Sequence, residues 1–560
     1  MALPDVTLTI QDGALGQVPA SVANAHAKVG VCSGGVVGTV YSFSDIGVAQ
    51  QTLGQGPLVD AIAHALAVSG GPVYAIPANP SAVGVASSVT HTGPGSGTVT
   101  AATAALSPAQ TIALKITTGG ANGTGAFAVS LNGGAYSSPV ATTSGTFSYA
   151  IPGTLTTVTL ASGQTWVLND VYTIDTLGAI TLTGSGPAAS NVTQVSSPLD
   201  AYSIVLTITT AGGLGAGVFT YSVDGGNSVS GQIAIPSGSG KYAIANTGVV
   251  ITFSGTFTAG DTYSWTTTAA GFSTSDLTTA LAALRAAAPE WGFVHVVATW
   301  TNASGAAAAA AIVDTQMATA ETQFRFAFGI IECPTSESDS TVAAAFASFS
   351  SLRTMVVAGD VGAVSPINGR ILRRNAAWIV AAHIAGIQPG EDAGFVGSTK
   401  PIRNVASLYR DEQKTQLLDA QRFTTMRSIP GRAGYFITNG NMMAPSGSDF
   451  NLVQRRRVMD AACRIARQAE LPYLNGSVRI DPSTGYIDER DAQQFEAKVN
   501  SQLSSGVVST GDASSSSVVV NRSANILSTS ILPVTVRIVP LGYLKFIATN
   551  IGFSNPALSA

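Results

Sequence analysis

The feature that most constrains the fold is a long stretch of nearly uncharged sequence between Gly84 and Gly271. Charged residues are rare there, and Thr, Ser, Gly, Ala and Val form short runs in which apolar and polar residues alternate. Alternation of this kind predicts β-strands that are buried on one face. We therefore expect all-β structure throughout this stretch.

The same stretch contains an internal repeat. The run ITTGGANGTGAFAVSLNGG at Ile116–Gly134 recurs as ITTAGGLGAGVFTYSVDGG at Ile208–Gly226. A repeat of this length indicates two copies of one structural unit. We expect an insert at residues 84–271 made of two tandem β-sandwich modules, at about residues 100–185 and 195–271.

An α/β pattern flanks the insert on both sides. Before it, short apolar strands at Lys28–Gly35 and Val73–Ile76 enclose a helix at Pro57–Val68, which is a β-α-β unit. The alternation resumes afterwards, which predicts one α/β core domain (residues 21–83 and 272–388) interrupted by the insert. The elements expected after the insert are a helix capped by Asp276, strands at Gly292–Trp300, Phe324–Glu332 and Thr354–Ala358, and helices at Gly305–Gln323, Asp339–Leu352 and Arg374–Ile387.

The sequence becomes basic after the core, and we expect a C-terminal α+β domain at residues 389–540. Its clearest element is an amphipathic helix at Asp449–Glu470, in which Asp460 is spaced to pair with arginines one turn away on either side. Its charged side is either a solvated face or a contact surface for an acidic partner, because guanidinium groups bind carboxylates well. This arginine row consists of Arg455, Arg456, Arg457, Arg464 and Arg467.

The chain ends in two apolar strand patterns, Val534–Val539 and Tyr543–Ile551. They follow a helical pattern at Asp488–Leu503 and a Ser-rich segment, Ser514–Ser517, which we expect to be a flexible turn. Terminal strands this apolar need partners, either in their own subunit or in a neighbour. The candidate arms are residues 1–20 and 541–560, with the strand residues Val6, Thr7, Leu8, Thr9, Ile10, Tyr543, Leu544, Lys545, Phe546, Ile547, Ala548, Thr549 and Ile551.

Composition and charge narrow the functional classes. Only 10% of the 560 residues are charged and the mean hydropathy is +0.31, yet no apolar run approaches the roughly 20 residues of a membrane span. The net charge of −4 does not suggest nucleic-acid binding. Three widely spaced cysteines and the absence of a secretory signal pattern predict a protein that is made in a reducing cytoplasm.

Catalytic and metal-binding patterns do not stand out. There is no G-x-S-x-G motif, and the Gly-Lys pair is followed by Tyr242 rather than by the Ser or Thr of a phosphate-binding loop. His295 and His383 are expected to be packed structural residues. Asp170 and Asp261, at equivalent repeat positions, fit turn or strand-end hydrogen bonding better than calcium binding. We expect no enzyme activity, metal or cofactor.

The second half of the chain resembles the tail sheath proteins of contractile-tailed bacteriophages and related contractile injection systems. The resemblance is carried by RFTTMRSIPGRAGYFITNGNMMAPSGSDFNLVQRRRVMDAACRIARQ at Arg422–Gln468 and by VRIVPLGYLKFIATNIGFSNP at Val536–Pro556. The opening LPDVTLTIQDG is also similar to the start of such proteins. The insert is not covered.

The resemblance implies a structural subunit that polymerises in stacked hexamers or a six-start helix around a tail tube, with baseplate and tail terminator proteins as further partners. It implies arms that complete β-sheets in neighbouring subunits, a C-terminal domain that faces the tube, and an insert that faces outward. The sheath would be assembled in the host cytoplasm, become part of the virion, and contract to drive the tube through the host envelope for genome ejection. Nucleotide hydrolysis, direct nucleic-acid contact and membrane insertion are not implied.

With this resemblance, we expect the arginine row to contact the tube. We also expect Val534–Val539 to stay in its own sheet and Tyr543–Ile551 to leave it. Two other functions stay open. The paired β-sandwich modules would suit a surface adhesin or glycan-binding protein, and an α/β hydrolase with decoration domains is a weaker alternative because no nucleophile–base pair is visible.

Overall fold

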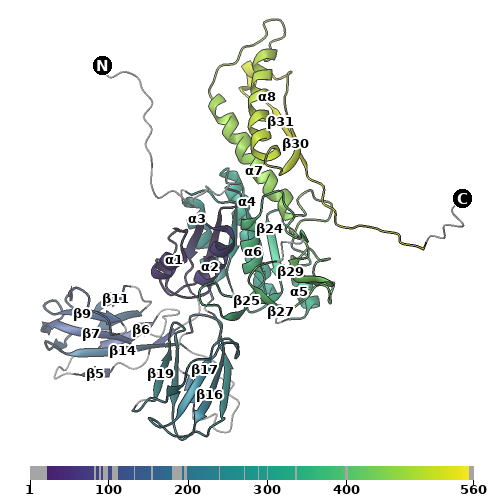
Figure 1. Cartoon of the computed structure of the whole chain (residues 1–560). Coiled ribbons are helices and arrows are strands. Elements are labelled where there is room, and N and C mark those ends of the chain that lie inside the picture. The colour runs from purple at the N-terminus through teal and green to yellow at the C-terminus, as the bar shows by residue number, and fades with distance from the viewer. Residues whose placement is uncertain are drawn as a thin grey trace, which may run out of the picture.

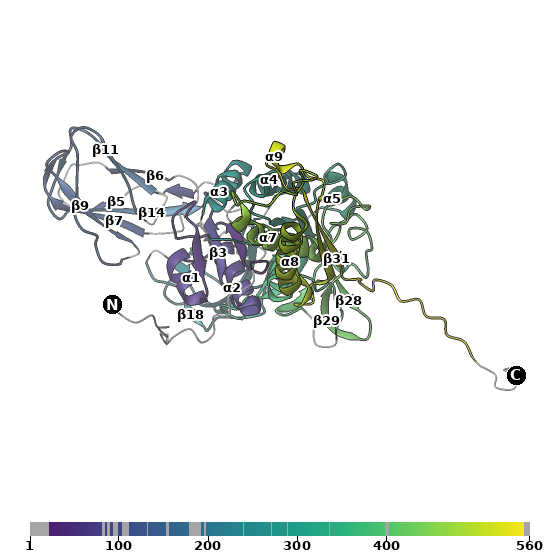
Figure 2. The ribbon, with the colours of Figure 1, turned by 90° about the horizontal axis from the view of Figure 1, so that it is seen from above.

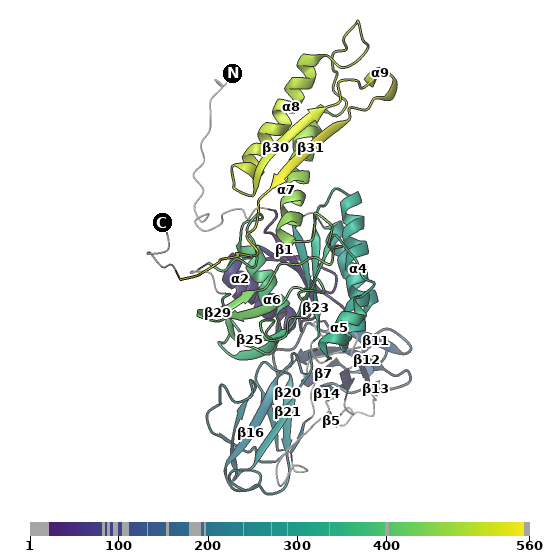
Figure 3. The ribbon, with the colours of Figure 1, turned by 90° about the vertical axis from the view of Figure 1, so that its right-hand side faces the viewer.

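Three parts make up the chain, with a C-terminal body at one end, an α/β core in the middle and the β-rich insert at the other end (Figures 1 and 3). The expected N-terminal strand Val6–Ile10 lies outside the described residues. The computed structural model describes residues 22–80, 84–86, 90–92, 99–103, 111–131, 133–152, 156–178, 192–194, 198–238, 240–269, 271–287, 289–298, 300–334, 337–397 and 402–553.

The core is a six-stranded sheet to which both sides of the insert contribute. Its order is β2-β3-β1-β22-β23-β24, and all neighbours are parallel except the edge pair β2–β3. The central strands are buried along their whole length, as expected of a parallel sheet covered on both faces. The strands are β1 (His26–Gly30), β2 (Tyr41–Phe43), β3 (Val73–Pro77), β22 (Phe293–Val296), β23 (Phe328–Cys333) and β24 (Thr354–Ala358).

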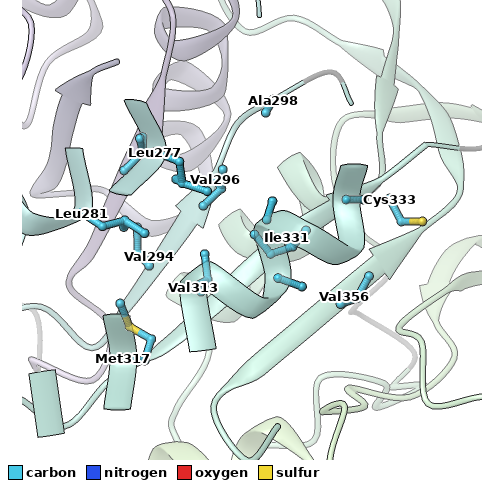
Figure 4. Close-up of a cluster of buried hydrophobic side chains, with 14 of the residues drawn as sticks. Leu277, Leu281, Val294, Val296, Ala298, Val313, Met317, Ile331, Cys333 and Val356 are labelled. Atoms are coloured by element: carbon cyan, nitrogen blue, oxygen red, sulfur yellow. The ribbon is translucent and has the colours of Figure 1, made fainter. Parts of the chain in front are cut away.

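The two faces of this sheet are covered by different helices. Because successive strand residues point to opposite faces, Val294 and Val296 pack with Leu277 of α3 and Val313 of α4 (Figure 4), whereas Phe293 packs with α6. α2 also packs against α6. The helices are α1 (Ile46–Leu53), α2 (Pro57–Ser69), α3 (Thr274–Ala286), α4 (Ala303–Thr322), α5 (Asp339–Ala345) and α6 (Ala377–Gly386).

Local sequence explains how α4 docks on the sheet. Asn302 caps the helix, and its side chain accepts a hydrogen bond of 2.8 Å from the Gly305 N–H. The buried side is lined with small residues such as Ala306. A Cβ at Gly329 of β23 would lie 2.1 Å from Val313 Cγ1, so only glycine allows this close approach. The start of α3 differs slightly from the prediction, since Ser273 is the cap and Asp276 completes a capping box.

The repeat in the sequence is also a repeat in strand pairing. In the first copy β7 lies between β9 and β14, and in the second β16 lies between β17 and β21, all antiparallel. Both pairings shift register at the same repeat position, between Ile116 and Thr118 and between Ile208 and Thr210. Each copy has its own hydrophobic core. These six strands are β7 (Thr111–Thr118), β9 (Ala126–Leu131), β14 (Val171–Gly178), β16 (Ser203–Thr210), β17 (Val218–Ser222) and β21 (Thr262–Thr266).

A second sheet in each copy also matches, with order β11-β12-β6 in the first and β19-β20-β15 in the second. Figure 2 shows the first copy extending away from the side of the core. The remaining insert strands are β4 (Gly84–Ala86), β5 (Thr90–Thr92), β6 (Val99–Thr103), β8 (Gly120–Ala121), β10 (Val140–Ala141), β11 (Phe147–Ala150), β12 (Thr156–Leu160), β13 (Thr165–Trp166), β15 (Val192–Gln194), β18 (Ile233–Ala234), β19 (Lys241–Ile244) and β20 (Val249–Phe253).

One buried arginine joins the second insert module to the core. Arg374 of β26 (Ile371–Asn375) donates to Asp200 Oδ2 at 2.6 Å and to Asp60 Oδ2 at 3.1 Å. Asp200 belongs to the insert and Asp60 to α2, and all three side chains are buried. The guanidinium also lies 4.6 Å from the ring centre of Trp378. Moving the module off the core would leave a buried charge unpaired, which is costly. The two ion pairs of Arg374 therefore hold the module in one place on the core.

The predicted domain at residues 389–540 is divided among three hydrophobic cores, and Leu418, Phe423 and Met443 pack in the core under α3 and α4. Ile402, Met426 and Val453 pack with α6 and the central sheet, whereas residues from Val458 onward form the separate core of the C-terminal body. The division between the α/β core and the C-terminal body therefore falls inside α7. The elements after β24 are β25 (Asp360–Val364), β26, α6, β27 (Val405–Leu408), β28 (Met426–Ile429), β29 (Arg432–Ile437), α7 (Val453–Glu470), η2 (Leu471–Tyr473), α8 (Glu489–Leu503), η3 (Ser504–Val508), β30 (Ala513–Val520), α9 (Ile526–Thr529) and β31 (Val534–Pro540).

The predicted turn at Ser514–Ser517 is wrong. These serines lie in β30, which pairs antiparallel with β31, and Ser517 is opposite Arg537. Serine has a low preference for strands, but here cross-strand pairing and the packing of Val518 decide the conformation. Pairing with β30 also confirms that Val534–Val539 stays in a sheet of its own subunit.

Candidate assembly interface

The last described residues form an extended arm that leaves the body (Figures 1 and 3). We call Tyr543–Lys545 the arm root and Phe546–Phe553 the arm tip. No strand of the described chain pairs with either. Phe546 is 96% exposed and Ile551 93% exposed. Burying one such side chain is worth roughly 1.5–3 kcal/mol, so the free arm leaves a large stabilisation unused.

The arm root is held by its own chain. The Tyr543 hydroxyl donates to the Gly390 carbonyl at 2.9 Å, and Lys545 Nζ lies 2.6 Å from Asp392 Oδ2 and 2.9 Å from Asn439 Oδ1. Partial burial raises the pKa of Tyr543 to about 12. Leu544, between them, is 88% exposed, as alternation along an extended chain requires. Tyr543 and Lys545, which were predicted to pair with a neighbouring subunit, therefore contact their own chain.

The hairpin β30–β31 offers open strand edges. The sheet has two strands, and no other strand of the described residues pairs with it. Val518 and Val520 on one face pack with α7 and α8 in the core of the C-terminal body, while Val519 and Val539 are about half exposed. Figure 3 shows both strands alongside α8. An unpaired edge presents backbone N–H and C=O groups to which another strand can add.

The arginine row does not form the outward face that the sequence pattern predicts. Arg456 and Arg457 are 5% and 2% exposed. Arg456 pairs with Asp460, as predicted, whereas Arg457 donates to Asn24 Oδ1 at 2.7 Å and to the Ile387 carbonyl at 3.0 Å. The prediction is wrong for these two residues because this part of α7 is enclosed by the core.

The remaining arginines of the row also contact their own chain but are only partly buried. Arg464 donates to the Phe326 carbonyl, Arg467 lies 4.1 Å from the ring centre of Phe324, and Arg455 donates weakly to Asn451. The second ion-pair partner of Asp460 is Arg353, at 3.3 Å, rather than the predicted Arg464.

Together these contacts make α7 a joint between the core and the C-terminal body. Burial lowers the pKa of Arg457 to about 10, which leaves the guanidinium protonated at neutral pH. Backbone carbonyls accept hydrogen bonds from it. Sequence patterns missed Arg353, Asp392 and Asn439, because each acts on a partner far away in the chain.

His295 lies in a buried strand and Asp261 in a turn, as predicted. His295 is buried in β22, with Nδ1 3.0 Å from Lys28 Nζ and Nε2 3.2 Å from Glu332 Oε1. Asp261 accepts a turn hydrogen bond of 3.0 Å from the Thr258 N–H. The described part of the chain contains no group of three or more His, Cys, Asp or Glu side chains placed to hold a metal ion. Nor does it contain a helix long and apolar enough to cross a membrane.

Solved structures with which this chain shares similarity include two sheath tail proteins. That of Desulfitobacterium hafniense is 11% identical, with 96% of this chain and 100% of that chain covered and a TM-score of 0.43. That of Listeria innocua is 10% identical, with 93% and 95% covered and a TM-score of 0.41. The helical sheath of the anti-feeding prophage in its contracted state is 14% identical, with 50% and 74% covered and a TM-score of 0.35.

Two family models together match nearly the whole chain. The model described as the DUF2586 N-terminal domain matches residues 3–441, and that described as the DUF2586 C-terminal domain matches residues 449–558. The gap between the matches lies just before α7, close to the division between the α/β core and the C-terminal body. No curated protein matches the chain. The chain belongs to the DUF2586 family.

Proposed function

We propose that this chain is the sheath subunit of a contractile tail and polymerises with copies of itself around an inner tube. The observation that carries the proposal is the arm tip, whose large apolar side chains are almost wholly exposed on a chain that also carries a hairpin with open edges. Exposed apolar surface of this kind marks an interaction site. A polymer of identical subunits would bury it in every copy.

In the proposed polymer, the arm tip of one subunit adds as a strand to the open edge of β30 or β31 in a neighbour. Strand addition supplies affinity through main-chain hydrogen bonds, and side-chain pockets add specificity. The even-numbered Phe546 and Ala548 would face one side of the extended sheet, and Ile547 and Ile551 the other. The N-terminal residues Val6–Ile10 are the second proposed arm.

The proposal includes a tube contact through the C-terminal body. Arg456 and Arg457 are left out of this contact because their guanidinium groups are buried and used within the chain. The partly exposed Arg455, Arg464 and Arg467 remain its candidate residues. Baseplate and terminator contacts, contraction, and delivery of a genome into a host belong to the same proposal, as does an insert that faces outward.

Truncation after Lys545 tests the proposal, because it removes the arm tip and keeps the whole arm root. We expect the full-length protein to form long tubes in negative-stain electron micrographs, and the truncated protein to stay monomeric with an unchanged circular dichroism spectrum. The substitution Ala548→Ser, which keeps the backbone and the large apolar side chains, is the matched control and should still polymerise. A full-length protein that stays monomeric at high concentration would rule the proposal out, whereas tubes formed by the truncated chain would rule out the arm tip as the link between subunits.

A further inference from the structure

Tyr543 and Lys545 fix the arm at a point five residues beyond the end of β31 at Pro540. We propose that the arm root is a latch that holds the arm on the loop after α6, and that its release gives the arm a second, longer reach. This inference rests on the proposed function, since a reach matters only if the arm tip binds a neighbour.

The receptor for the latch is already organised by its own hydrogen bonds. Asp392 Oδ1 accepts from the Gly394 N–H at 2.9 Å, which leaves Oδ2 for Lys545. The Asn439 amide donates to the Asp419 carboxylate at 2.9 Å, which turns its oxygen towards Lys545 Nζ. The two acceptors are thus oriented without help from the arm.

Two glycines bring the receptor loop close to its neighbours. A Cβ at Gly390 would lie 2.6 Å from Asp512 Cα, and a Cβ at Gly394 would lie 2.9 Å from the Thr438 carbonyl oxygen. The Gly390 N–H also donates to Asp512 Oδ1 at 2.7 Å, while its carbonyl accepts from Tyr543. The loop therefore connects the core, the C-terminal body and the arm root.

The same place holds the root of the other terminal segment. Arg457 donates to the carbonyls of Ile387 and Gln388, at the start of this loop, and to the side chain of Asn24. Asn24 is among the first described residues of the chain. A force applied to either end of the chain therefore reaches the same loop.

The latch gives the arm two pivots. When it is closed, the arm tip swings about Lys545. When it is open, the tip swings about the end of β31, on a radius longer by roughly 16 Å for five extended residues. The side chain of Lys545 is 30% exposed and that of Asp392 13% exposed, and ion pairs this close to solvent are weak and sensitive to salt. The latch can therefore open without unfolding the body, as a change in spacing between linked subunits would require.

Trypsin cleavage after Lys545 reports the open latch, because the lysine must leave Asp392 to enter the protease pocket. When opening and closing are fast, the cleavage rate follows the open population. The assay uses dilute full-length protein, shown to be monomeric by light scattering, and follows release of the peptide Phe546–Ala560 by mass spectrometry. We expect Asp392→Asn to raise the rate about threefold and its combination with Asn439→Ala and Tyr543→Phe about tenfold.

Asp449→Asn, which removes the same charge from an exposed position, is the control and should leave the rate unchanged. Salt at about 0.5 M should speed cleavage of the unmodified protein but not of Asp392→Asn, a comparison that does not depend on how well the combined variant folds. Equal rates for all variants, with no salt effect, would overturn the latch. Because the assay uses monomers, that outcome would leave the tube-forming test of the sheath proposal unaffected.

Discussion

The insert and the C-terminal end are both rich in β-forming sequence, yet their strands differ in what they pair with. In the insert, β16 lies between β17 and β21 and packs over a core of its own. At the C-terminal end, β31 has one partner, and the arm tip beyond it has none in the described chain. The arm tip nevertheless has a more apolar sequence than β16.

This difference shows that a strand pattern specifies a conformation but not the chain that supplies its partner. In the described part of the insert, β7 and β16 each lie between two strands of their own module, and each module has a hydrophobic core of its own. The C-terminal end keeps its unpaired edges and apolar side chains at the surface. We infer that assembly depends on the second region and not on the first, and the following changes test that contrast.

The largest effect is expected from removing the apolar character of the arm tip. The combined substitutions Phe546→Ser, Ile547→Ser and Ile551→Ser should raise the concentration needed for polymerisation about a thousandfold or more, since each buried side chain contributes roughly 1.5–3 kcal/mol. Sedimentation of polymers over a concentration series measures this. Val229→Ser, at a position of the insert that is 62% exposed, is the control and should not change polymerisation. An equal loss of polymerisation in this variant would contradict the inference that assembly depends on the C-terminal end and not on the insert.

A cavity in the core of the insert should leave assembly intact. Phe219 is fully buried, with its ring centre 4.7 Å from that of Phe253, so Phe219→Ala should destabilise the second module by about 3–5 kcal/mol. Calorimetry should show one transition moved to lower temperature, while tubes still form. Phe127→Ala is the matched change in the first module. Loss of tubes in either variant would place that module in the lattice.

Acid should weaken the core beneath the insert more than the C-terminal body. Burial lowers the pKa of His64 to about 4, while in the unfolded chain it is near 6.5. The unfolded chain therefore takes up a proton first, and stability falls as the pH drops from 6.5 towards 4. Over two pH units the loss is about 2–3 kcal/mol.

His64→Leu should remove that part of the acid sensitivity, seen by comparing chemical unfolding of the two proteins at pH 7 and pH 4.5. In hydrogen exchange, the amides whose protection differs between the two proteins should lie in α2 and α6, because His64 lies on α2 and its ring meets that of Trp378 of α6 edge to face. A variant whose stability changes with pH as steeply as that of the parent would contradict the assignment.

The smallest effect is expected in the serine-rich strand of the hairpin. Ser515→Thr and Ser517→Thr replace exposed residues of β30 with a residue that favours strands, and should stabilise the C-terminal body by a few tenths of a kcal/mol each. The melting transition of the C-terminal body measures this. A lower melting temperature would mean that the exposed face of the hairpin has a steric constraint of its own.

Patterns within single elements could be predicted from the sequence, because they depend on local periodicity. The alternation of α2 with flanking strands and the repeat at Ile116–Gly134 and Ile208–Gly226 needed no knowledge of tertiary contacts. The register shift shared by both copies was not predictable, since strand register depends on pairing. The serine segment at Ser514–Ser517 was misassigned for the same reason, because its partner lies in β31.

The arginine row shows why the candidate site was only partly predictable. An amphipathic pattern predicts that every arginine faces solvent. Arg457 can nevertheless be buried, because the Ile387 carbonyl accepts a hydrogen bond from its guanidinium. Every residue carries a backbone carbonyl, so the sequence does not indicate which carbonyls will accept a hydrogen bond from a side chain. The arm tip was recognised by its apolar alternation, whereas its anchorage through Lys545 depends on Asp392 and Asn439, which are distant in the sequence.

The pairing of Arg374 with Asp60 and Asp200 has a consequence for protein engineering. A shortened chain without residues 84–271 would keep Arg374 and Asp60 but lose Asp200, and would bury a neutral ion pair where the parent buries a net negative charge. The Arg374 N–H groups that donate to Asp200 would then need another hydrogen-bond acceptor. Replacing the first module alone keeps Asp200 in place, which makes that module the better position for grafting a foreign domain onto this scaffold.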